Sequence, residues 1–185
     1  LEMSINPSKY SCIRLGPRHD ALCANITAHD GSDIPWVKSI RYLGIEKKSS
    51  RVFKCVFDTA KKSFYKAYNA IFGKIGRSAT ADVVMHLLKV KCLPILLYGL
   101  NACPLNVPDY KSLDFVIVRT LPKNFETFSQ VIISECRTAF NLSLMCDIIS
   151  RHKINFLIRY SASENLLCKI FALNAECELK LLRQK

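Results

Sequence analysis

The chain has 185 residues, of which 50% are hydrophobic and 23% are charged, and its formal net charge at pH 7 is +12. This composition is typical of a folded globular chain and excludes long disorder. The stretch that comes nearest to a membrane-spanning helix, residues 92–105, is too short and is interrupted by two prolines, a glycine and an asparagine. We therefore expect it to be buried in the protein, with no membrane as a partner.

The first residue is Leu1 rather than methionine, and no charged-then-apolar leader follows it. We expect a piece of a longer reading frame without a signal peptide. The nine cysteines are odd in number and form no Cys-x-x-Cys pair. This pattern predicts buried thiols in a reducing compartment rather than a disulfide framework. Cys146 and His152 lack the repeated close spacing of zinc ligands, so we expect no metal site.

The positive charge is concentrated in about a third of the chain. Residues 38–91 contain thirteen basic and three acidic side chains, a net charge of +10. Such a segment attracts polyanions, and nucleic acid is the commonest of them. An anionic membrane surface, an acidic protein or a merely solvated helix face would be compatible with the same charge.

Short strands are predicted first. Residues 10–16 alternate apolar and polar side chains and stop at a Gly-Pro pair, so they predict a strand. Residues 24–28 are a second candidate, and residues 37–45 a third. Between the last two, the Asp-Gly pair within residues 29–33 predicts a turn. We expect a small antiparallel unit.

Helical periodicity follows. Apolar side chains recur at steps of three and four from Phe53 to Ile75, which predicts one long helix that ends at Gly73 or, better, at Gly76. On this helix a separate basic face is expected, made of Lys54, Lys61, Lys62 and Lys66.

A second helix should begin after Ser78 or Thr80 as the capping residue, with Asp82 in its first turn and a kink at Pro94. Residues 101–108 predict a break, and helical spacing returns in segments 109–121, 127–140 and 145–182. Strands that precede helices in this way indicate an α+β fold.

Three motifs occur in a fixed order. Residues 1–9 contain Asn-Pro-x-Lys and lead into the possible strand at 12–16, residues 40–45 contain Tyr-Leu-Gly, and residues 88–100 form a Leu- and Lys-rich stretch around Pro94. Together they resemble motif D, the primer-grip hairpin and the thumb region of a LINE-type (non-LTR) retrotransposon reverse transcriptase. Residues 113–116 are similar to the start of the helical region after the thumb, whereas Leu121-Pro122 departs from the expected helix.

The resemblance implies three regions. They are distal palm strands at residues 1–48, thumb-like helices at 49–104 and a C-terminal helical extension at 105–185. It also implies an RNA template–DNA primer duplex as partner, together with the upstream palm and fingers of the same polyprotein, inside the cell in the cytoplasm or nucleus. The residues expected to hold nucleic acid are Arg41, Tyr42, Leu43, Gly44, Lys54, Lys61, Lys62 and Lys66.

Catalysis is expected to need residues outside this chain. Such polymerases hold Mg²⁺ with an Asp-Asp pair, and the sequence contains no such pair. We therefore expect no cofactor in this chain, Mg²⁺ only in the full-length enzyme, and no polymerase activity from the chain alone. Lys9 aligns with the motif D lysine and could stabilise the departing pyrophosphate.

Two other interpretations remain open. The chain could be a stand-alone basic helical module that binds nucleic acid or a protein, or a non-functional relic of a mobile element. At the level of residues, Lys9 could be an ordinary exposed lysine and Tyr42 a half-buried strand residue. The phenylalanines of the predicted long helix fit a core better than a base-stacking platform.

Overall fold

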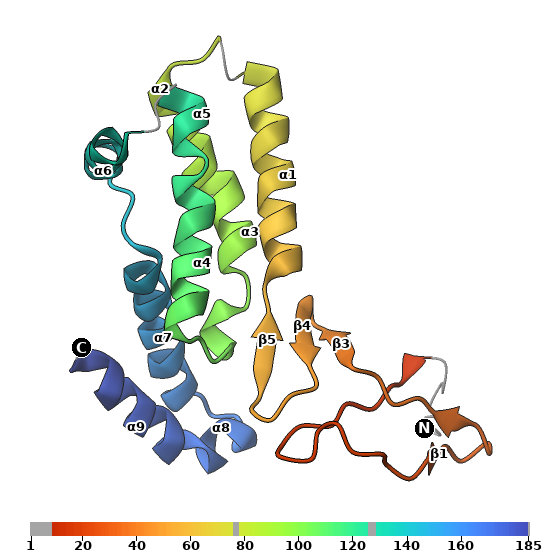
Figure 1. Ribbon diagram of the computed structural model, residues 1–185. Helices are drawn as coiled ribbons and strands as arrows, with labels where there is room; N and C mark the ends of the chain where they lie inside the picture. The colour runs from red at the N-terminus through yellow and green to blue at the C-terminus, as the bar shows by residue number, and fades with distance from the viewer. Residues whose placement is uncertain (1–8, 76–77, 126–128, 185) are drawn as a thin grey trace. The chain divides into compact units, whose positions relative to one another are not determined.

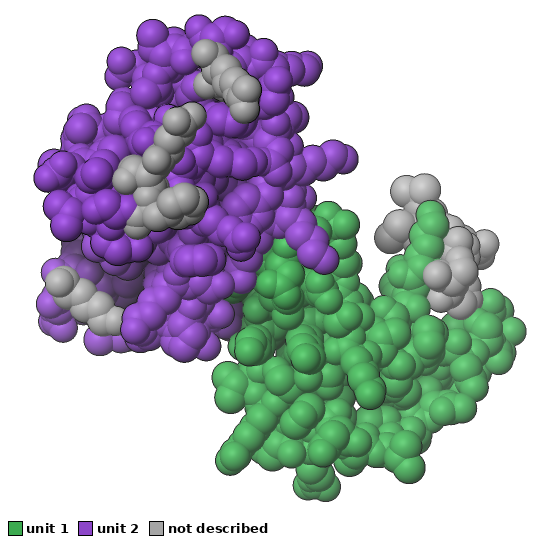
Figure 2. All heavy atoms as spheres, turned by 45° about the horizontal axis from the view of Figure 1, so that its top comes forward, with its two compact units in different colours: residues 1–59 green, residues 60–185 purple. Residues whose placement is uncertain are grey.

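The computed structural model describes residues 9–75, 78–125 and 129–184 (Figure 1). The fold is α+β, with small antiparallel sheets followed by a mostly helical region, as predicted. The chain divides into two compact units, which are coloured separately in Figure 2. Unit 1 is Leu1–Thr59 and unit 2 is Ala60–Lys185. A boundary between thumb-like and C-terminal helices at residues 104 and 105 stays a prediction.

Unit 1 contains two antiparallel sheets. Strands β1 (Ile26–Thr27) and β2 (Asp33–Ile34) form the first. Strands β3 (Ser39–Tyr42), β4 (Ile45–Lys48) and β5 (Lys54–Val56) form the second, in the order β3-β4-β5. The predicted strand at 24–28 is confirmed at its centre by β1. The predicted strand at 37–45 is confirmed only from Ser39 to Tyr42, where the chain turns back.

The predicted strand at residues 10–16 is wrong in its extent, because only Cys12 makes a ladder contact, a bridge to Trp36. The Cys12 amide donates to the Pro35 carbonyl at 2.9 Å. Further along, the Gly16 amide donates to the Ser50 carbonyl at 3.0 Å instead of joining a strand. Hydrogen bonds to loop carbonyls thus satisfy backbone amides of this segment that a longer strand would have paired within a sheet.

The predicted turn between β1 and β2 is confirmed. Gly31 has a φ of 82°, and the Asp30 carboxylate accepts hydrogen bonds from the Ser32 amide at 3.0 Å and from the Ser32 hydroxyl at 2.6 Å. These two bonds lower the pKa of Asp30. The local Asx hydrogen bonds therefore hold the hairpin closed.

Unit 2 is built from helices. Their bounds are α1 (Asp58–Ile75), α2 (Ala81–Leu87), the π-helical turn η2 (Leu88–Cys92), α3 (Leu93–Leu97), the 3-10 turn η3 (Leu100–Ala102), α4 (Val107–Val118), α5 (Leu121–Phe125), α6 (Gln130–Ala139), α7 (Met145–Ser161), α8 (Leu166–Ile170) and α9 (Ala172–Arg183).

Helix α1 begins later than predicted. The periodic pattern started at Phe53, but Lys54 lies in strand β5 and the first helical residue is Asp58. Cys55 of β5 pairs with Lys47 of β4, so sheet hydrogen bonding overrides the helical spacing over these residues. The predicted end at Gly76 lies outside the described residues.

The core of unit 2 contains buried side chains of most of its helices, and in its α1 part Tyr68 reaches the α4–α5 region. Phe64 and Tyr68 of α1 are fully buried, and their rings stack with centroids 6.5 Å apart. The Tyr68 hydroxyl lies 3.1 Å from the Thr120 carbonyl and 2.9 Å from the Asn124 side-chain oxygen. The aromatic stripe of α1 is therefore core, as the spacing indicated.

The helical run Ala81–Ala102 behaves differently from the simple kinked helix expected around Pro94. A π turn from Leu88 to Cys92 precedes α3, and Pro94 stands in the first turn of α3. Cys92 and Leu93 have right-handed helical φ and ψ, so the backbone stays helical up to Pro94, which has no amide hydrogen to donate. The predicted first-turn position of Asp82 is confirmed, and the capping position is Thr80.

This same run is long and apolar enough to cross a membrane, because it spans 22 residues with a mean hydropathy of 1.7 in its most apolar window. Length and composition alone do not separate such a helix from the core helix of a folded domain. Of that window, 39% is buried inside the structure, and Val84, Met85, Leu88 and Leu96 are among the core side chains. The expected absence of a membrane partner stays a prediction.

The last predicted helical segment, 145–182, is divided into α7, α8 and α9. The Asn165 side chain accepts a hydrogen bond from the Leu167 amide at 2.9 Å and so caps α8. Helix α7 packs against α9, and the Lys153 ammonium pairs with the Glu178 carboxylate between them. Leu121-Pro122 begins the short helix α5 rather than continuing α4.

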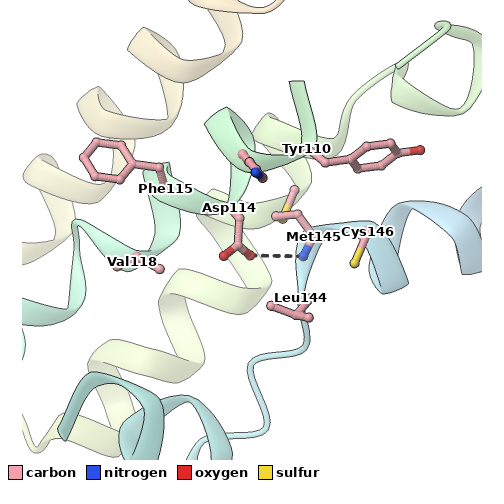
Figure 3. A pocket seen from close by; sticks show the side chains of 8 residues that line it. Tyr110, Asp114, Phe115, Val118, Leu144, Met145 and Cys146 are labelled. Atoms are coloured by element: carbon pink, nitrogen blue, oxygen red, sulfur yellow. Dashed lines mark hydrogen bonds between the residues drawn. The ribbon is translucent and has the colours of Figure 1, made fainter. Parts of the chain in front are cut away.

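An ion pair ties α4, α6 and α7 together. The Arg137 guanidinium donates two hydrogen bonds to the Asp114 carboxylate, at 2.7 and 2.9 Å. The same carboxylate accepts from the Met145 amide at 3.1 Å, at the first residue of α7, as Figure 3 shows. Asp114 thus caps a helix whose own N-cap residue, Leu144, has no side-chain cap bond.

Candidate nucleic-acid interface

The tip of the β3–β4 hairpin is formed by the predicted primer-grip residues. Leu43 and Gly44 both have positive φ, at 48° and 80°, as a two-residue type I′ turn requires. Tyr42 and Leu43 are 58% and 70% exposed. The hairpin therefore presents part of an aromatic ring and an apolar side chain to solvent. The alternative of Tyr42 as an ordinary, half-buried strand residue stays open.

A lysine lies against the Tyr42 ring. The Lys47 ammonium is 4.6 Å from the centre of the Tyr42 ring and 5.7 Å from that of Phe53. The cation limits the rotation of the ring and adds positive charge beside it. An aromatic face with an adjacent ammonium is suited to stacking on a base or sugar while attracting a phosphate.

The left-handed conformation of Leu43 costs free energy, because a bulky side chain at positive φ is strained by about 1 kcal/mol or more. We predict that Leu43→Asn raises the free energy of unfolding by about 1 kcal/mol, since Asn-Gly is the preferred type I′ pair. Urea unfolding measures it. Leu22→Asn is the control, because Leu22 is fully exposed in the same unit without positive φ. Equal effects at both positions would contradict the strain argument.

A basic surface covers one face of the three-stranded sheet. Lys48 of β4 lies directly opposite Lys54 of β5, and Arg41 of β3 is two residues from Ser39, the β3 partner of Lys48. Residues paired across a ladder, and residues two apart along a strand, share a face. Arg41, Lys48 and Lys54 are all exposed there, and we call them the sheet cations.

Like charges directly opposite one another destabilise a sheet. Glu46, the cross-strand partner of Arg41, is the acidic side chain on this face, and within residues 9–75 none of the sheet cations forms an ion pair with it. The face is therefore suited to binding an anion. Lys54 belongs to this surface, so its predicted place on the basic face of the long helix is wrong.

Helix α1 presents its own basic side. Lys62 and Lys66, one turn apart, are exposed, whereas Phe64 and Tyr68 are buried. We call Lys62 and Lys66 the α1 lysines. Lys61 is not part of this side, because it is only partly exposed and its ammonium donates to the Ser112 hydroxyl of α4 at 2.8 Å. The predicted four-lysine face thus reduces to two residues.

The motif D-like segment is described only at its end. Residues 1–8, which include the Asn-Pro pair, lie outside the described residues. Lys9 is exposed, and a role near a nucleotide phosphate stays a prediction. Its alternative as an ordinary exposed lysine is compatible with the same exposure.

A pocket of about 310 Å³ lies beside α4 and the start of α7 (Figure 3). Its carboxylate, Asp114, is already bonded to Arg137 and to the Met145 amide. Burial raises the pKa of the Cys146 thiol, as does the adjacent Asp147 carboxylate, and burial also raises the pKa of the Tyr110 phenol. The thiol is therefore poorly suited to act as a nucleophile.

Metal ligands are not gathered anywhere in the part of the chain that the structure describes, since no group of three or more His, Cys, Asp or Glu side chains could hold an ion there. The described cysteines are all free thiols. Comparison with protein-family models, with curated proteins and with solved structures gives no match to this chain. The two basic surfaces and the hairpin tip are therefore the candidate site.

Proposed function

We propose that this chain grips an RNA template–DNA primer duplex as the downstream part of a LINE-type reverse transcriptase, without the catalytic aspartates. The observation that supports this most directly is the division of α1 into a buried aromatic side and an exposed side with the α1 lysines. The helix is held by the core through Phe64 and Tyr68. It can therefore keep Lys62 and Lys66 in place against a backbone without ordering itself on binding.

The charges on α1 suit a phosphate backbone. Its one acidic residue, Asp58, stands in the first turn, where it favours the helix dipole. Lys62 and Lys66 are about 6 Å apart along the axis, from the rise of 1.5 Å per residue. Contacts of this kind position a duplex without reading its sequence, and each releases condensed counterions, which makes binding salt-dependent.

Unit 1 offers complementary contacts. The sheet cations can neutralise phosphates, and Tyr42 with Leu43 at the hairpin tip can pack on the sugar or base of a primer strand. Arg41 is on the sheet face, while Gly44 lets the tip approach a ligand closely because it has no side chain. In this proposal the chain holds the duplex, and the residues that perform the chemistry belong to the upstream palm.

The test removes the α1 lysines. In the Lys62→Gln/Lys66→Gln variant, the slope of log K against log salt concentration for an RNA–DNA duplex should become shallower by about 2, one for each lost phosphate contact. Fluorescence anisotropy titrations at several salt concentrations measure both affinity and slope. A fourfold variant that also replaces Lys48 and Lys54 should flatten the slope further.

The matched control is Lys180→Gln/Arg183→Gln on α9, which removes the same charge from two exposed residues far along the chain. An equal loss in both double variants would show that net charge alone drives binding, and would contradict the α1 assignment. A duplex grip also predicts tighter binding to the hybrid duplex than to either single strand. Equal affinity for all three would favour the stand-alone basic module instead.

A further inference from the structure

Unit 2 contains a second pocket, which is formed by other residues than the α1 lysines. It has a volume of about 340 Å³ and lies between α1 and the junction of α4 with α5. It is lined by Tyr65, Tyr68, Asn69, Arg119, Thr120 and Lys123. This volume is within the range of pockets that hold small ligands.

Two cations, Arg119 and Lys123, line this pocket. Arg119 ends α4 and Lys123 lies four residues later in α5. Among the described residues neither forms an ion pair with a carboxylate. The Lys123 ammonium donates one hydrogen bond to the Asn69 side-chain oxygen at 2.9 Å and lies 5.6 Å from the centre of the Phe72 ring. Its other two N–H donors are available.

The Arg119 side chain makes fewer polar contacts than that of Lys123 among the described residues. It is exposed, and its guanidinium has no hydrogen-bond acceptor within the described residues. Its five N–H groups form a planar fork that matches the oxygens of a phosphate. The pocket therefore contains a guanidinium with no acceptor among the described residues and an ammonium with one of its three donors engaged.

Three neutral hydroxyl groups line the pocket, and they differ in whether they already have a hydrogen-bond partner. The Thr120 hydroxyl donates to the Ile117 carbonyl at 2.7 Å, and the Tyr68 hydroxyl is taken by Thr120 and Asn124. The Tyr65 hydroxyl has no such partner among the described residues. Burial raises the pKa of Tyr65, and the Arg119 charge offsets this only in part, so the phenol stays protonated as a donor.

We propose that Arg119, Lys123 and Tyr65 form a binding site for a phosphate monoester. A terminal phosphate carries a charge near −2 at neutral pH and three strong acceptor oxygens, which match two cations and a phenol. A phosphodiester within a strand carries a single charge and is flanked on both sides by nucleosides, so it suits an open surface such as that of the α1 lysines. A concave pocket of this size suits a terminal phosphate.

Two sources present this chemistry, a free nucleoside monophosphate and the 5′-phosphorylated end of a strand. The pocket and the α1 lysines are different residues, so each can be removed without the other. Failure of the phosphate site would leave the salt dependence of duplex binding unchanged. Failure of the duplex proposal would leave the binding of a free monophosphate unchanged.

The test is calorimetric titration of the full chain with inorganic phosphate and with adenosine 5′-monophosphate, at constant ionic strength set with sodium chloride. Saturable binding is expected, with the dissociation constant raised at least tenfold by Arg119→Gln and by Lys123→Gln. Tyr65→Phe should raise it less. Arg151→Gln, which replaces an exposed arginine on α7, should leave it unchanged.

The primary variant is Arg119→Gln, because Arg119 is exposed and its loss leaves the α1–α5 hydrogen bond of Lys123 intact. An unchanged circular dichroism melt confirms that it folds. Anisotropy with 5′-phosphorylated and 5′-hydroxyl oligonucleotides then identifies the source. Either a preference for the phosphorylated end or binding of the free monophosphate supports the site, provided that Arg119→Gln weakens that binding at least tenfold. The proposal is overturned if Arg119→Gln leaves both kinds of binding unchanged, or if Arg119→Gln and Arg151→Gln weaken them equally.

Discussion

Replacing Asp114 by alanine is expected to lower the free energy of unfolding by about 3 kcal/mol, because a partly buried ion pair loses one partner. The Asp114 and Arg137 side chains are only 23% and 13% exposed. In the variant the guanidinium keeps its hydrogen bonds to the carbonyls of Leu142 and Ser143 but has no counter-charge. The Met145 amide loses its acceptor at the same time. Urea unfolding followed by circular dichroism measures the loss.

Asp147→Ala provides the control for this prediction. Asp147 is also acidic and stands in the first turn of the same helix α7, but it is exposed and pairs with no cation among the described residues. Its loss should cost no more than about 1 kcal/mol from the helix dipole. If Asp114→Ala were no more destabilising than Asp147→Ala, the ion pair would not be what holds α4, α6 and α7 together.

The second large effect is expected at Tyr68→Phe, which should lower the free energy of unfolding by about 1–2 kcal/mol. The ring still fills the core, but the Thr120 carbonyl and the Asn124 side chain lose their buried partner. Tyr98→Phe is the control, because the Tyr98 side chain is exposed and its hydroxyl reaches water. Equal and negligible effects at both positions would contradict the role of the buried hydroxyl.

The same tyrosine predicts a dependence on alkaline pH. Burial raises the pKa of Tyr68 to about 12 from an ordinary value of 10.0, partly offset by the hydrogen bond with Asn124. The native state therefore retains the proton that the unfolded state releases, so this stability is full below pH 10 and is lost as the pH rises toward 12. The stability advantage of the native protein over Tyr68→Phe should narrow across this window. A constant difference from pH 8 to pH 11 would contradict it.

Local signals predicted much of the fold. The Asp-Gly turn before β2 and the aromatic stripe from Phe64 onward were predicted correctly, because each depends on residues close in sequence. The start of α1 was predicted wrongly, because Phe53 and Phe57 continue the helical spacing by chance. What places Lys54 in a strand is the ladder to β4, which a single sequence does not display.

The sequence contains a signal that the last predicted helix is divided, but the continuous apolar spacing of residues 145–182 obscured it. No glycine or proline interrupts residues 145–182, but Ser163 and Asn165 are residues that favour caps over helix interiors. The candidate site shows the same limit more strongly. Lys61 and Lys62 are adjacent and chemically identical, and only the position of α4 shows that the first one faces Ser112.

Residues that the motifs did not indicate complete the basic surfaces. Lys48 became a candidate only through its register opposite Lys54, and Arg119 through the pocket that it shares with Tyr65. The spacing of Arg119 and Lys123 was visible in the sequence. Their lack of a carboxylate partner among the described residues was not visible there, because carboxylates that approach a cation in space can come from anywhere along the chain.

The hydrogen bonds of Tyr68 also bear on how the chain is synthesised. Its partners Thr120 and Asn124 come 52 and 56 residues later in the sequence. At a translation rate of about 5–20 residues per second, the ribosome makes them roughly 3–11 seconds after Tyr68. During that interval the Tyr68 hydroxyl lacks both of its native partners, so this part of the core is completed only when α5 follows.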